Sequence, residues 1–237
     1  MSINIAMFKT IFHQYSKVAN QTLDWLPMDS KERYEENLKN NLSKLQKFNW
    51  VDSTFTYNFN SHGFRCEEFT EDPSIMFLGC SLTMGVGLPL ENNWPTLVSK
   101  GLNLKMINLG IGGSGPDTTF RLANHYIPQL KPKIVIRLQS FKGRFSLVTE
   151  NKIYEFLPSQ CPVEYQKFYF EWATYKENLV LHELKHSLAI ESICNKNNIK
   201  YLSFSLDDFI QLDMARDLMH FGILSSKAFS EKILTHF

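Results

Sequence analysis

The sequence predicts an α/β fold in which a parallel sheet is covered by helices on both faces. Three observations favour it. Short apolar runs alternate with helix-like segments, the run at residues 75–78 has no polar alternation, and a glycine-rich turn at 110–116 follows another run. Alternating strands and helices are typical of a parallel sheet, whose strands are buried on both sides.

The predicted elements alternate along the chain from residue 75 onward. Strands are expected at 75–79, 105–109, 133–139 and 200–205. Helices are expected at 92–101, at about 117–129, at about 176–197 and from about 222. Residues 140–175 are rich in aromatic side chains and lack a clear period, so we expect loops or a small insertion there.

The N-terminal 50 residues are expected to form a helical extension of a main α/β domain at 51–237. Asp29 and Glu32 are spaced as a helix N-terminal capping pair. Apolar side chains then recur at helical spacing, at Tyr34, Leu38, Leu42 and Leu45. The spacing predicts one amphipathic helix that packs on the main domain or, alternatively, on a second copy of the chain. Residues 51–60 alternate as a strand does.

Composition excludes several classes of partner. The 237 residues carry 25 basic and 24 acidic side chains, a formal net charge of +1. This balance gives no support for a nucleic-acid or anionic-membrane partner. The four cysteines form no C-x-x-C pair, and scattered thiols suit a reducing compartment. Without an apolar run long enough to cross a bilayer, the expected location is cytoplasmic. Nothing in the sequence indicates the oligomeric state.

Two short segments far apart in the chain carry candidate catalytic side chains. Ser81 lies in the turn at 79–85, directly after an apolar run, and Asp217 and His220 lie near the C-terminus. A serine hydroxyl is a weak nucleophile that needs a base within hydrogen-bond reach. His220 can act as that base, and Asp217 can hold its imidazole in the required tautomer. The structural alternative is that Ser81 and Asp217 each cap a helix.

The same segments resemble the sequence blocks of a known family. Residues 79–85, Gly-Cys-Ser-Leu-Thr-Met-Gly, resemble the G-D-S-x-T-x-G block of the SGNH (GDSL-like) hydrolases. Residues 108–113 resemble the second block, residues 217–220 the final D-x-x-H block, and residues 60–65 a segment common in some members. The resemblance covers roughly residues 58–236 and leaves out the N-terminal 50.

This resemblance implies a flavodoxin-like three-layer α/β/α sandwich that uses no metal or cofactor. It implies ester or acyl-carbohydrate substrates. By the same resemblance Ser81 is the nucleophile, His220 the base and Asp217 the residue that orients it. The N–H groups of Ser81 and Gly113 are the expected oxyanion donors.

The sequence departs from the family pattern at two places. Cys80 replaces the Asp of the first block, which leaves open whether the thiol is the nucleophile. We favour Ser81, because the side chain beside a turn nucleophile is expected to point into the core. The third block should place an Asn after the third strand, where residues 137–144 have none. Losing one oxyanion donor costs about 2.7–4 kcal/mol. The candidate replacements are Gln139, Ser140 and Arg144.

A second motif points to different chemistry. Residues 182–186, His-Glu-Leu-Lys-His, match the H-E-x-x-H pattern of zinc proteases, which places two imidazoles on one helix face. No third ligand follows at the family spacing, and Lys185 would place a cation beside the metal. Leu181, Leu184 and Leu188 indicate an ordinary amphipathic helix with His182 and His186 on its flank. We therefore expect no metal site here.

The expected function is a serine-dependent esterase or acyl hydrolase acting on a small ester or an acylated carbohydrate. Two alternatives use the same fold. An acyltransferase would share every catalytic residue and exclude water. A non-catalytic carbohydrate-binding or partner-binding relative would account for the missing third-block Asn. Independently of these alternatives, Arg144 could bind a negatively charged group of the substrate or be a solvated surface arginine.

Overall fold

The structure, a computed structural model, describes residues 13, 15–148 and 153–237. Its centre is a four-stranded parallel sheet in the order β4-β3-β5-β8. The strands are β3 (Ser74–Leu78), β4 (Lys105–Asn108), β5 (Ile134–Leu138) and β8 (Lys200–Phe204). In order of appearance this is 2-1-3-4, which matches the start of the flavodoxin-like strand order. The predicted parallel sheet is confirmed.

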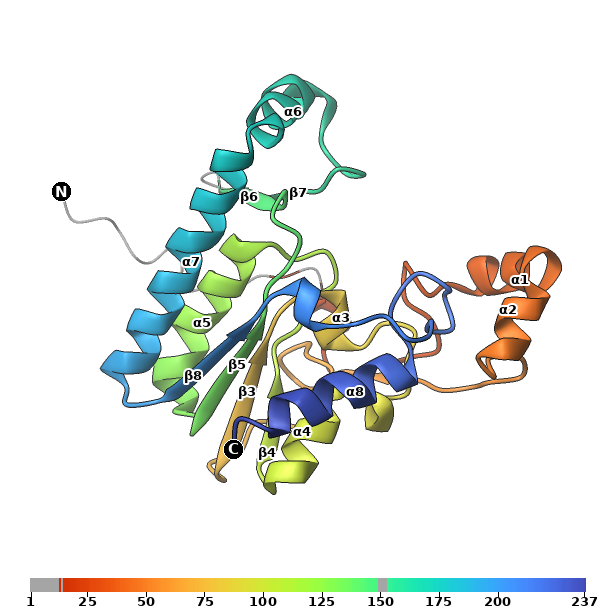
Figure 1. Cartoon of the computed structure of the whole chain (residues 1–237), viewed down its shortest axis with the longest axis horizontal. Helices are drawn as coiled ribbons and strands as arrows, with labels where there is room; N and C mark the ends of the chain where they lie inside the picture. Colours follow the sequence, from red (N-terminus) through yellow and green to blue (C-terminus); the bar gives the residue numbers. More distant parts are fainter. Residues whose placement is uncertain (1–12, 14, 149–152) are drawn as a thin grey trace.

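Helices cover both faces of the sheet (Figure 1). On one face lie α4 (Trp94–Leu102) and α8 (Ile223–Leu234), which contact each other, and on the other lie α5 (Pro116–Leu130) and α7 (Lys176–Lys196). A separate apolar core fills the space on each side of the sheet. The predicted three-layer α/β/α sandwich is therefore confirmed, and the boundaries of these eight elements agree with the sequence to within two residues.

The local sequence explains where these elements begin and end. β3 and β5 consist entirely of buried residues, as expected of central parallel strands. The side chain of Asn93 caps α4 by accepting from the Thr96 N–H, and Pro95 occupies the first turn, where its missing N–H costs nothing. α5 also starts with a proline, and its C-cap is Lys131, whose φ is 42°.

The N-terminal segment differs from the single capped helix that we expected. It contains η2 (Ser16–Val18), β1 (Thr22–Leu23), α1 (Lys31–Asn40) and α2 (Leu42–Lys47), and Asn41 separates the two α-helices. Ser30, not Asp29, is the N-cap of α1, since its side chain accepts from the Arg33 N–H. In the predicted strand region only β2 (Tyr57–Asn58) forms, pairing with β1. A domain boundary at residue 50 stays a prediction.

The aromatic segment before α7 is more regular than expected. It contains the hairpin of β6 (Phe145–Val148) and β7 (Ile153–Phe156), then η4 (Val163–Tyr165) and α6 (Gln166–Thr174). The rings of Phe145 and Phe156 stack across the hairpin at 4.5 Å, and Tyr169 of α6 packs on both. Aromatic pairs across strands therefore stabilise the insertion, which extends beyond the sheet in Figure 1.

Three short helices complete the chain: α3 (Ser81–Met84), η3 (Leu90–Asn92) and η5 (Leu206–Asp208). Within the residues described, no helix is both long and apolar enough to cross a membrane.

Candidate active site

Ser81 begins α3, and two residues separate it from Leu78, the end of β3. The turn between them needs Gly79, because a Cβ there would collide with the Thr83 hydroxyl and lie 2.9 Å from the Leu138 carbonyl oxygen. Cys80 is fully buried in the core on the α4 and α8 side of the sheet. The turn therefore directs the thiol into the core, as expected from the sequence, and places Ser81 at the carboxyl edge of the sheet.

The glycine-rich loop after β4 is hydrogen-bonded to this turn. Asn108 donates to the Thr83 carbonyl at 2.9 Å and accepts from the Gly110 N–H at 3.0 Å. The Ser114 hydroxyl donates to the Gly79 carbonyl at 3.0 Å. The first and second sequence blocks are thus held together directly.

Gly113 lies in this loop with a φ of 78°, a conformation that favours glycine. Among the described residues, no group accepts a hydrogen bond from the backbone N–H of Ser81 or of Gly113. Both donors are therefore open to an incoming oxygen, which is what an oxyanion hole requires.

Asp217 and His220 meet in the loop before α8. The buried Asp217 carboxylate accepts from His220 Nδ1 through Oδ2, and through Oδ1 it accepts from the N–H groups of Met219 and His220 at 3.0 Å each. Leu218 adopts a φ of 54° in the tight turn between them. Asp217 therefore fixes Nδ1 as the protonated nitrogen and leaves Nε2 for proton transfer.

The capping alternative for Asp217 is contradicted by its neighbour Asp213. Asp213 accepts from the Leu224 and Ser225 N–H groups, at 2.9 Å each, and so satisfies the first turn of α8. Asp217 makes no such contact within the described chain, and its oxygens face His220 and the turn.

The two halves of the site approach each other through backbone pairing. The Arg216 N–H donates to the Gly87 carbonyl at 3.1 Å, which joins the Asp217 segment to the loop after α3. Phe221, next to His220, packs against the cluster that contains Cys80 and Leu82. No hydrogen bond joins His220 to Ser81 in the part of the chain that the structure describes. Catalytic hydrogen bonds often tighten only when substrate binds.

The N-terminal segment supports the Asp217 loop, a contact that no sequence pattern predicted. Asp29 and Arg216 form a buried ion pair at 2.7 Å. From α1, Asn37 donates to the Asp217 carbonyl at 3.4 Å, and from the segment after α2, Trp50 donates to the Met214 carbonyl at 2.6 Å. Asp29 is the residue that the sequence pattern assigned to helix capping, and its true partner lies 187 positions away.

Residues 57–65 hold the loop after α3. The buried Arg65 guanidinium donates to the carbonyls of Gly85 at 2.5 Å and Leu88 at 2.7 Å, and the Tyr57 hydroxyl accepts from the Gly87 N–H at 2.8 Å. Burial lowers the pKa of Arg65 to about 10, so the side chain remains a cation at neutral pH. Arg65 belongs to the upstream segment that resembled the family, and its contacts show that this segment supports the loop after α3.

The three candidates for the missing third-block Asn differ in their surroundings. Gln139 is directed to β8, where its amide donates to the Ser203 hydroxyl at 3.3 Å. Arg144 stacks over Phe141 and donates to the Ser114 carbonyl at 3.4 Å. The Ser140 hydroxyl is buried and has no hydrogen-bond partner among the described residues. An unpaired buried hydroxyl is costly, which singles out Ser140.

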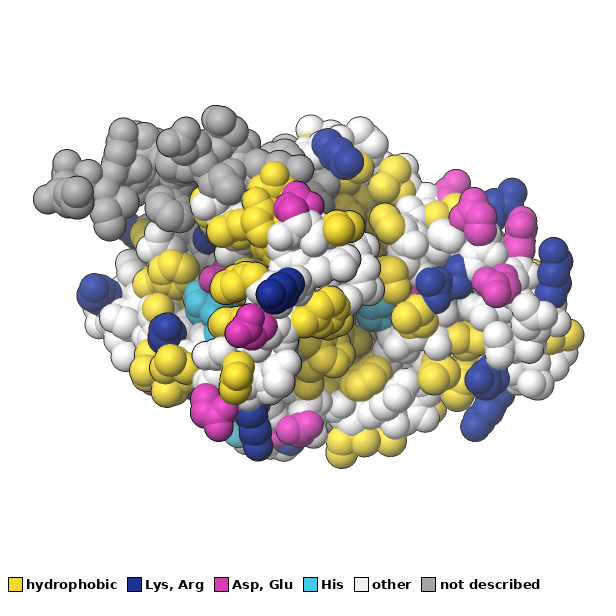
Figure 2. Space-filling model, turned by 90° about the horizontal axis from the view of Figure 1, so that it is seen from above, with side chains coloured by type: hydrophobic (Ala, Val, Ile, Leu, Met, Phe, Trp, Pro, Cys, Tyr) yellow, Lys and Arg dark blue, Asp and Glu magenta, His cyan; other side chains and the backbone are white. Residues whose placement is uncertain are grey.

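A pocket of about 760 Å³ lies at the carboxyl ends of β5 and β8 and is lined by residues 139–144, Pro158, Ser159, Leu179 and residues 205–207. Figure 2 views the molecule from the end toward which the strands run, and hydrophobic side chains border a hollow on this face. A separate small pocket lies beside Gly113. His13 also lines this pocket, and burial lowers the pKa of its imidazole to about 4. The main pocket has the size of a small-molecule site.

The H-E-x-x-H segment has a different environment from that of a zinc protease. Glu183 is buried against Arg137 of β5, with Arg137 Nη1 and Glu183 Oε1 2.7 Å apart, so it cannot serve as a general base. Our interpretation of the leucines is wrong: Leu181, Leu184 and Leu188 are 50–55% exposed. The Arg137–Glu183 ion pair turns α7 so that the face with Glu183, Ile190 and Cys194 is buried and its leucines face outward.

Both histidines of that segment contact Asp117 in the first turn of α5. Burial raises the pKa of the Asp117 carboxyl, but the close contacts with His182 and His186 outweigh this effect, and the pKa of Asp117 lies below its usual value. Burial lowers the pKa of His186, but the contacts with Asp117 and the His182 carbonyl raise it by more, so the net shift is upward. Our expectation did not include Asp117, because its position on a different helix leaves no local signal.

Comparison with known proteins found similar solved structures. No family model matches the chain, and no curated protein matches it by sequence. A psychrotrophic esterase from Pseudoalteromonas sp. aligns with 69% of this chain and 96% of its own, at 15% identity and a TM-score of 0.37. A member of the lipolytic protein G-D-S-L family from Veillonella parvula aligns with 69% of this chain and 97% of its own, at 14% identity and a TM-score of 0.38. A family two carbohydrate esterase from Clostridium thermocellum, solved with cellohexaose, aligns with 69% of this chain and 63% of its own, at 13% identity and a TM-score of 0.39.

These values describe a distant likeness, whereas the chain's own structure shows its fold directly. The strand order is flavodoxin-like, and hydrogen bonds tie the first two sequence blocks together at the carboxyl edge of β3. The D-x-x-H block holds its acid and imidazole in contact in the loop before α8. The chain therefore has a flavodoxin-like three-layer α/β/α fold, in which these blocks are arranged as expected from the sequence.

Proposed function

We propose that the chain is a serine-dependent ester hydrolase of the SGNH type. The observation that carries this proposal is the bond between the buried Asp217 carboxylate and His220 Nδ1. A carboxylate in this position stabilises the imidazolium that forms when His220 accepts a proton. The nucleophile would be Ser81, since Cys80 is buried in the core.

The proposed reaction has two steps. Ser81 Oγ attacks the ester carbonyl carbon while His220 Nε2 takes its proton, and His220 then returns the proton to the leaving alcohol. Water, activated by the same imidazole, releases the acid and regenerates Ser81. The open N–H groups of Ser81 and Gly113 would bind the oxyanion in both steps.

The substrate is expected to be a small ester or an acylated carbohydrate that occupies the pocket beyond β5 and β8. Its lining combines an aromatic ring, Phe141, with polar and charged side chains that include Lys142 and Asp207. Apolar surface with a few polar groups is typical of small-molecule sites.

For the missing third-block donor, we propose Ser140. Its hydroxyl is buried without a partner, and residue 140 follows Leu138, whose carbonyl lies against the Gly79 turn. A donor at this point would face the same edge of the sheet as Ser81. A hydroxyl can donate one hydrogen bond and could thus replace one amide N–H.

Fluorophosphonate labelling tests the nucleophile. We expect the purified protein to label covalently, Ser81→Ala to abolish labelling, and Cys80→Ala, a matched control at the adjacent residue, to retain it. Mass spectrometry of the labelled peptide locates the adduct. Labelling that persists in Ser81→Ala, or its absence from the folded wild-type protein, would exclude this mechanism.

Product analysis with an added alcohol separates hydrolysis from acyl transfer.

Ser140→Ala is expected to lower kcat for a small ester about 10²–10³-fold with little change in KM, because an oxyanion donor acts mainly in the transition state. Ser159→Ala, which removes a hydroxyl from the same pocket, is the control and should keep kcat near the wild-type value. Equal kcat values for the two variants would show that Ser140 is not the replacement donor.

A further inference from the structure

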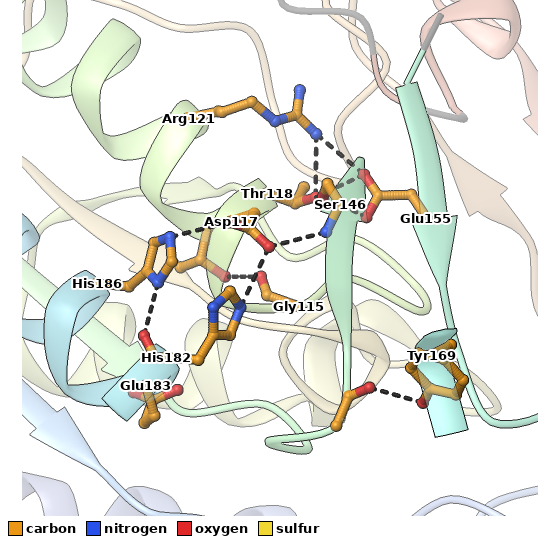
Figure 3. A network of polar contacts seen from close by, with 12 residues as sticks. Gly115, Asp117, Thr118, Arg121, Ser146, Glu155, Tyr169, His182, Glu183 and His186 are labelled. Atoms are coloured by element: carbon orange, nitrogen blue, oxygen red, sulfur yellow. Dashed lines mark hydrogen bonds and ion pairs between the residues drawn. The ribbon is translucent and has the colours of Figure 1, made fainter. Parts of the chain in front are cut away.

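Three side chains with metal-ligating atoms converge between α5 and α7. Asp117 Oδ2 lies 3.2 Å from His182 Nε2, and Asp117 Oδ1 lies 3.0 Å from His186 Nε2. One ligand atom from each residue lies within 4.8 Å of the other two. Figure 3 shows both imidazoles directed from α7 toward the Asp117 carboxylate at the start of α5.

Neighbouring groups orient these ligands. His186 Nδ1 donates to the His182 carbonyl at 2.7 Å, which fixes the ring and directs Nε2 toward Asp117. The Ser146 N–H of β6 donates to Asp117 Oδ2 at 2.8 Å. Metal-binding histidines and carboxylates usually have outer partners of this kind, which hold the ligands in place.

His182 supplies an independent sign that the cluster lacks a component. Its Nε2 atom is buried, and among the described residues its contact with Asp117 falls short of hydrogen-bond geometry. A buried nitrogen without a good partner is costly. A cation between the three side chains would satisfy this atom through its lone pair.

We propose that Asp117, His182 and His186 bind a divalent transition-metal ion, with Zn²⁺ as the preferred ion. Zinc binds imidazole nitrogen and carboxylate oxygen at about 2.0–2.2 Å, so tetrahedral donors lie about 3.3 Å apart. The Asp117–histidine separations of 3.0 and 3.2 Å, each to a different carboxylate oxygen, are close to this value, and the ligand atoms of all three residues lie within 4.8 Å of one another. Two histidines and one carboxylate suit such an ion, and water would complete the coordination.

The surroundings permit entry of the ion and protect it. The side chains of both histidines are 15% exposed and that of Asp117 is 24% exposed, so the cluster is reachable from solvent. The ring edges of Trp172 and Phe120 pack beside His182 and His186. A partly apolar shell of this kind restricts water around a metal.

The proposed site is not that of a zinc protease. Glu183, which would be the general base in the H-E-x-x-H pattern, forms an ion pair with Arg137. The third ligand is Asp117 of α5 and not a residue that follows the pattern in the sequence. The ion would join α7 to the first turn of α5, which directly follows the Gly113 loop. Its role is therefore structural, and it does not depend on the proposed esterase reaction.

Metal content and binding test the proposal. The chain is purified without chelators, stripped with a strong chelator and titrated with Zn²⁺ against a chromophoric competitor. We expect one equivalent per chain and a Co²⁺ adduct with the visible absorption of a four-coordinate site. His182→Ala should weaken Zn²⁺ binding at least about 100-fold and abolish that absorption, since even outer-shell changes cost 10–100-fold.

Matched variants separate this site from adventitious binding. His125→Ala removes a histidine of α5 that lies outside the cluster, and His236→Ala removes an exposed histidine near the C-terminus. Both variants should bind Zn²⁺ as the wild type does. Asp117→Asn also removes a ligand, but it disturbs the Ser146 contact, so His182→Ala, which keeps the Asp117–His186 pair, is the deciding variant. Failure of the folded wild-type protein to bind one equivalent, or unchanged binding in His182→Ala, would overturn the proposal.

Discussion

Ser81→Ala is expected to lower kcat for ester hydrolysis by about 10⁶-fold, because nucleophile and base act as one unit and losing either removes the covalent pathway. His220→Ala should lower kcat by a similar factor, and the double variant should be little worse than either single one. Steady-state kinetics on a small chromogenic ester measures the effect. Additive losses in the double variant would mean that the two residues do not work together.

The acid of the proposed triad has a control close by in the same loop. Asp217→Asn should lower kcat about 10⁴-fold, since an amide would favour the wrong imidazole tautomer. Asp213 is also buried, but its carboxylate caps α8. Asp213→Asn should therefore cost about 1 kcal/mol of stability and leave kcat of the folded protein near wild type. Equal kcat losses in the two variants would contradict the role assigned to Asp217.

The fold was predictable where the sequence signal is local. β3 and β5 are continuous buried runs, and their neighbours in the sheet are bounded by glycine or polar turns, so strand positions follow from a few adjacent residues. The caps of α4 and α5 are also local, since an Asn or Gly precedes a proline-containing first turn. Periodicity could not reveal the hairpin of β6 and β7, because aromatic pairing across strands stabilises it.

Predictions failed where a distant charge decides the outcome. Asp29 has the spacing of a capping residue, yet it pairs with Arg216, and Ser30 caps α1 instead. The leucines of α7 suggested a buried stripe, but the Arg137–Glu183 ion pair sets the orientation of that helix. In both cases a buried arginine must find an acid, and desolvation makes that requirement stronger than local propensity.

The same division holds for the candidate site. Ser81, Asp217 and His220 could be proposed from the sequence because each block is a short local pattern of a few residues. The supports of these blocks come from elsewhere: Asn37 and Trp50 reach the loop that holds His220. Asp117 could not be paired with His182 before α5 and α7 were placed side by side. These contacts required the tertiary structure.

Asp29→Ala is expected to lower the free energy of unfolding by about 3–5 kcal/mol, because it leaves the Arg216 guanidinium buried without its counter-charge. Arg216 is 2% exposed, and its guanidinium lies between the rings of Trp25 and Phe55, so it cannot turn to solvent without breaking this packing. Asp29→Ala also removes the acceptor of the Tyr57 hydroxyl. Urea denaturation measures the loss of stability.

Two further variants show that the loss comes from burial of the charge. Glu35 pairs with Lys31 on the surface of α1 at 3.8 Å with both side chains more than half exposed, so Glu35→Gln should cost at most about 0.5 kcal/mol. Asp29→Leu combined with Arg216→Met removes both charges and should recover most of the stability lost in Asp29→Ala. Because Arg216 adjoins Asp217, Asp29→Ala should also lower kcat at temperatures where the protein stays folded. A loss below about 1 kcal/mol with unchanged kcat would mean that the N-terminal segment does not support the His220 loop.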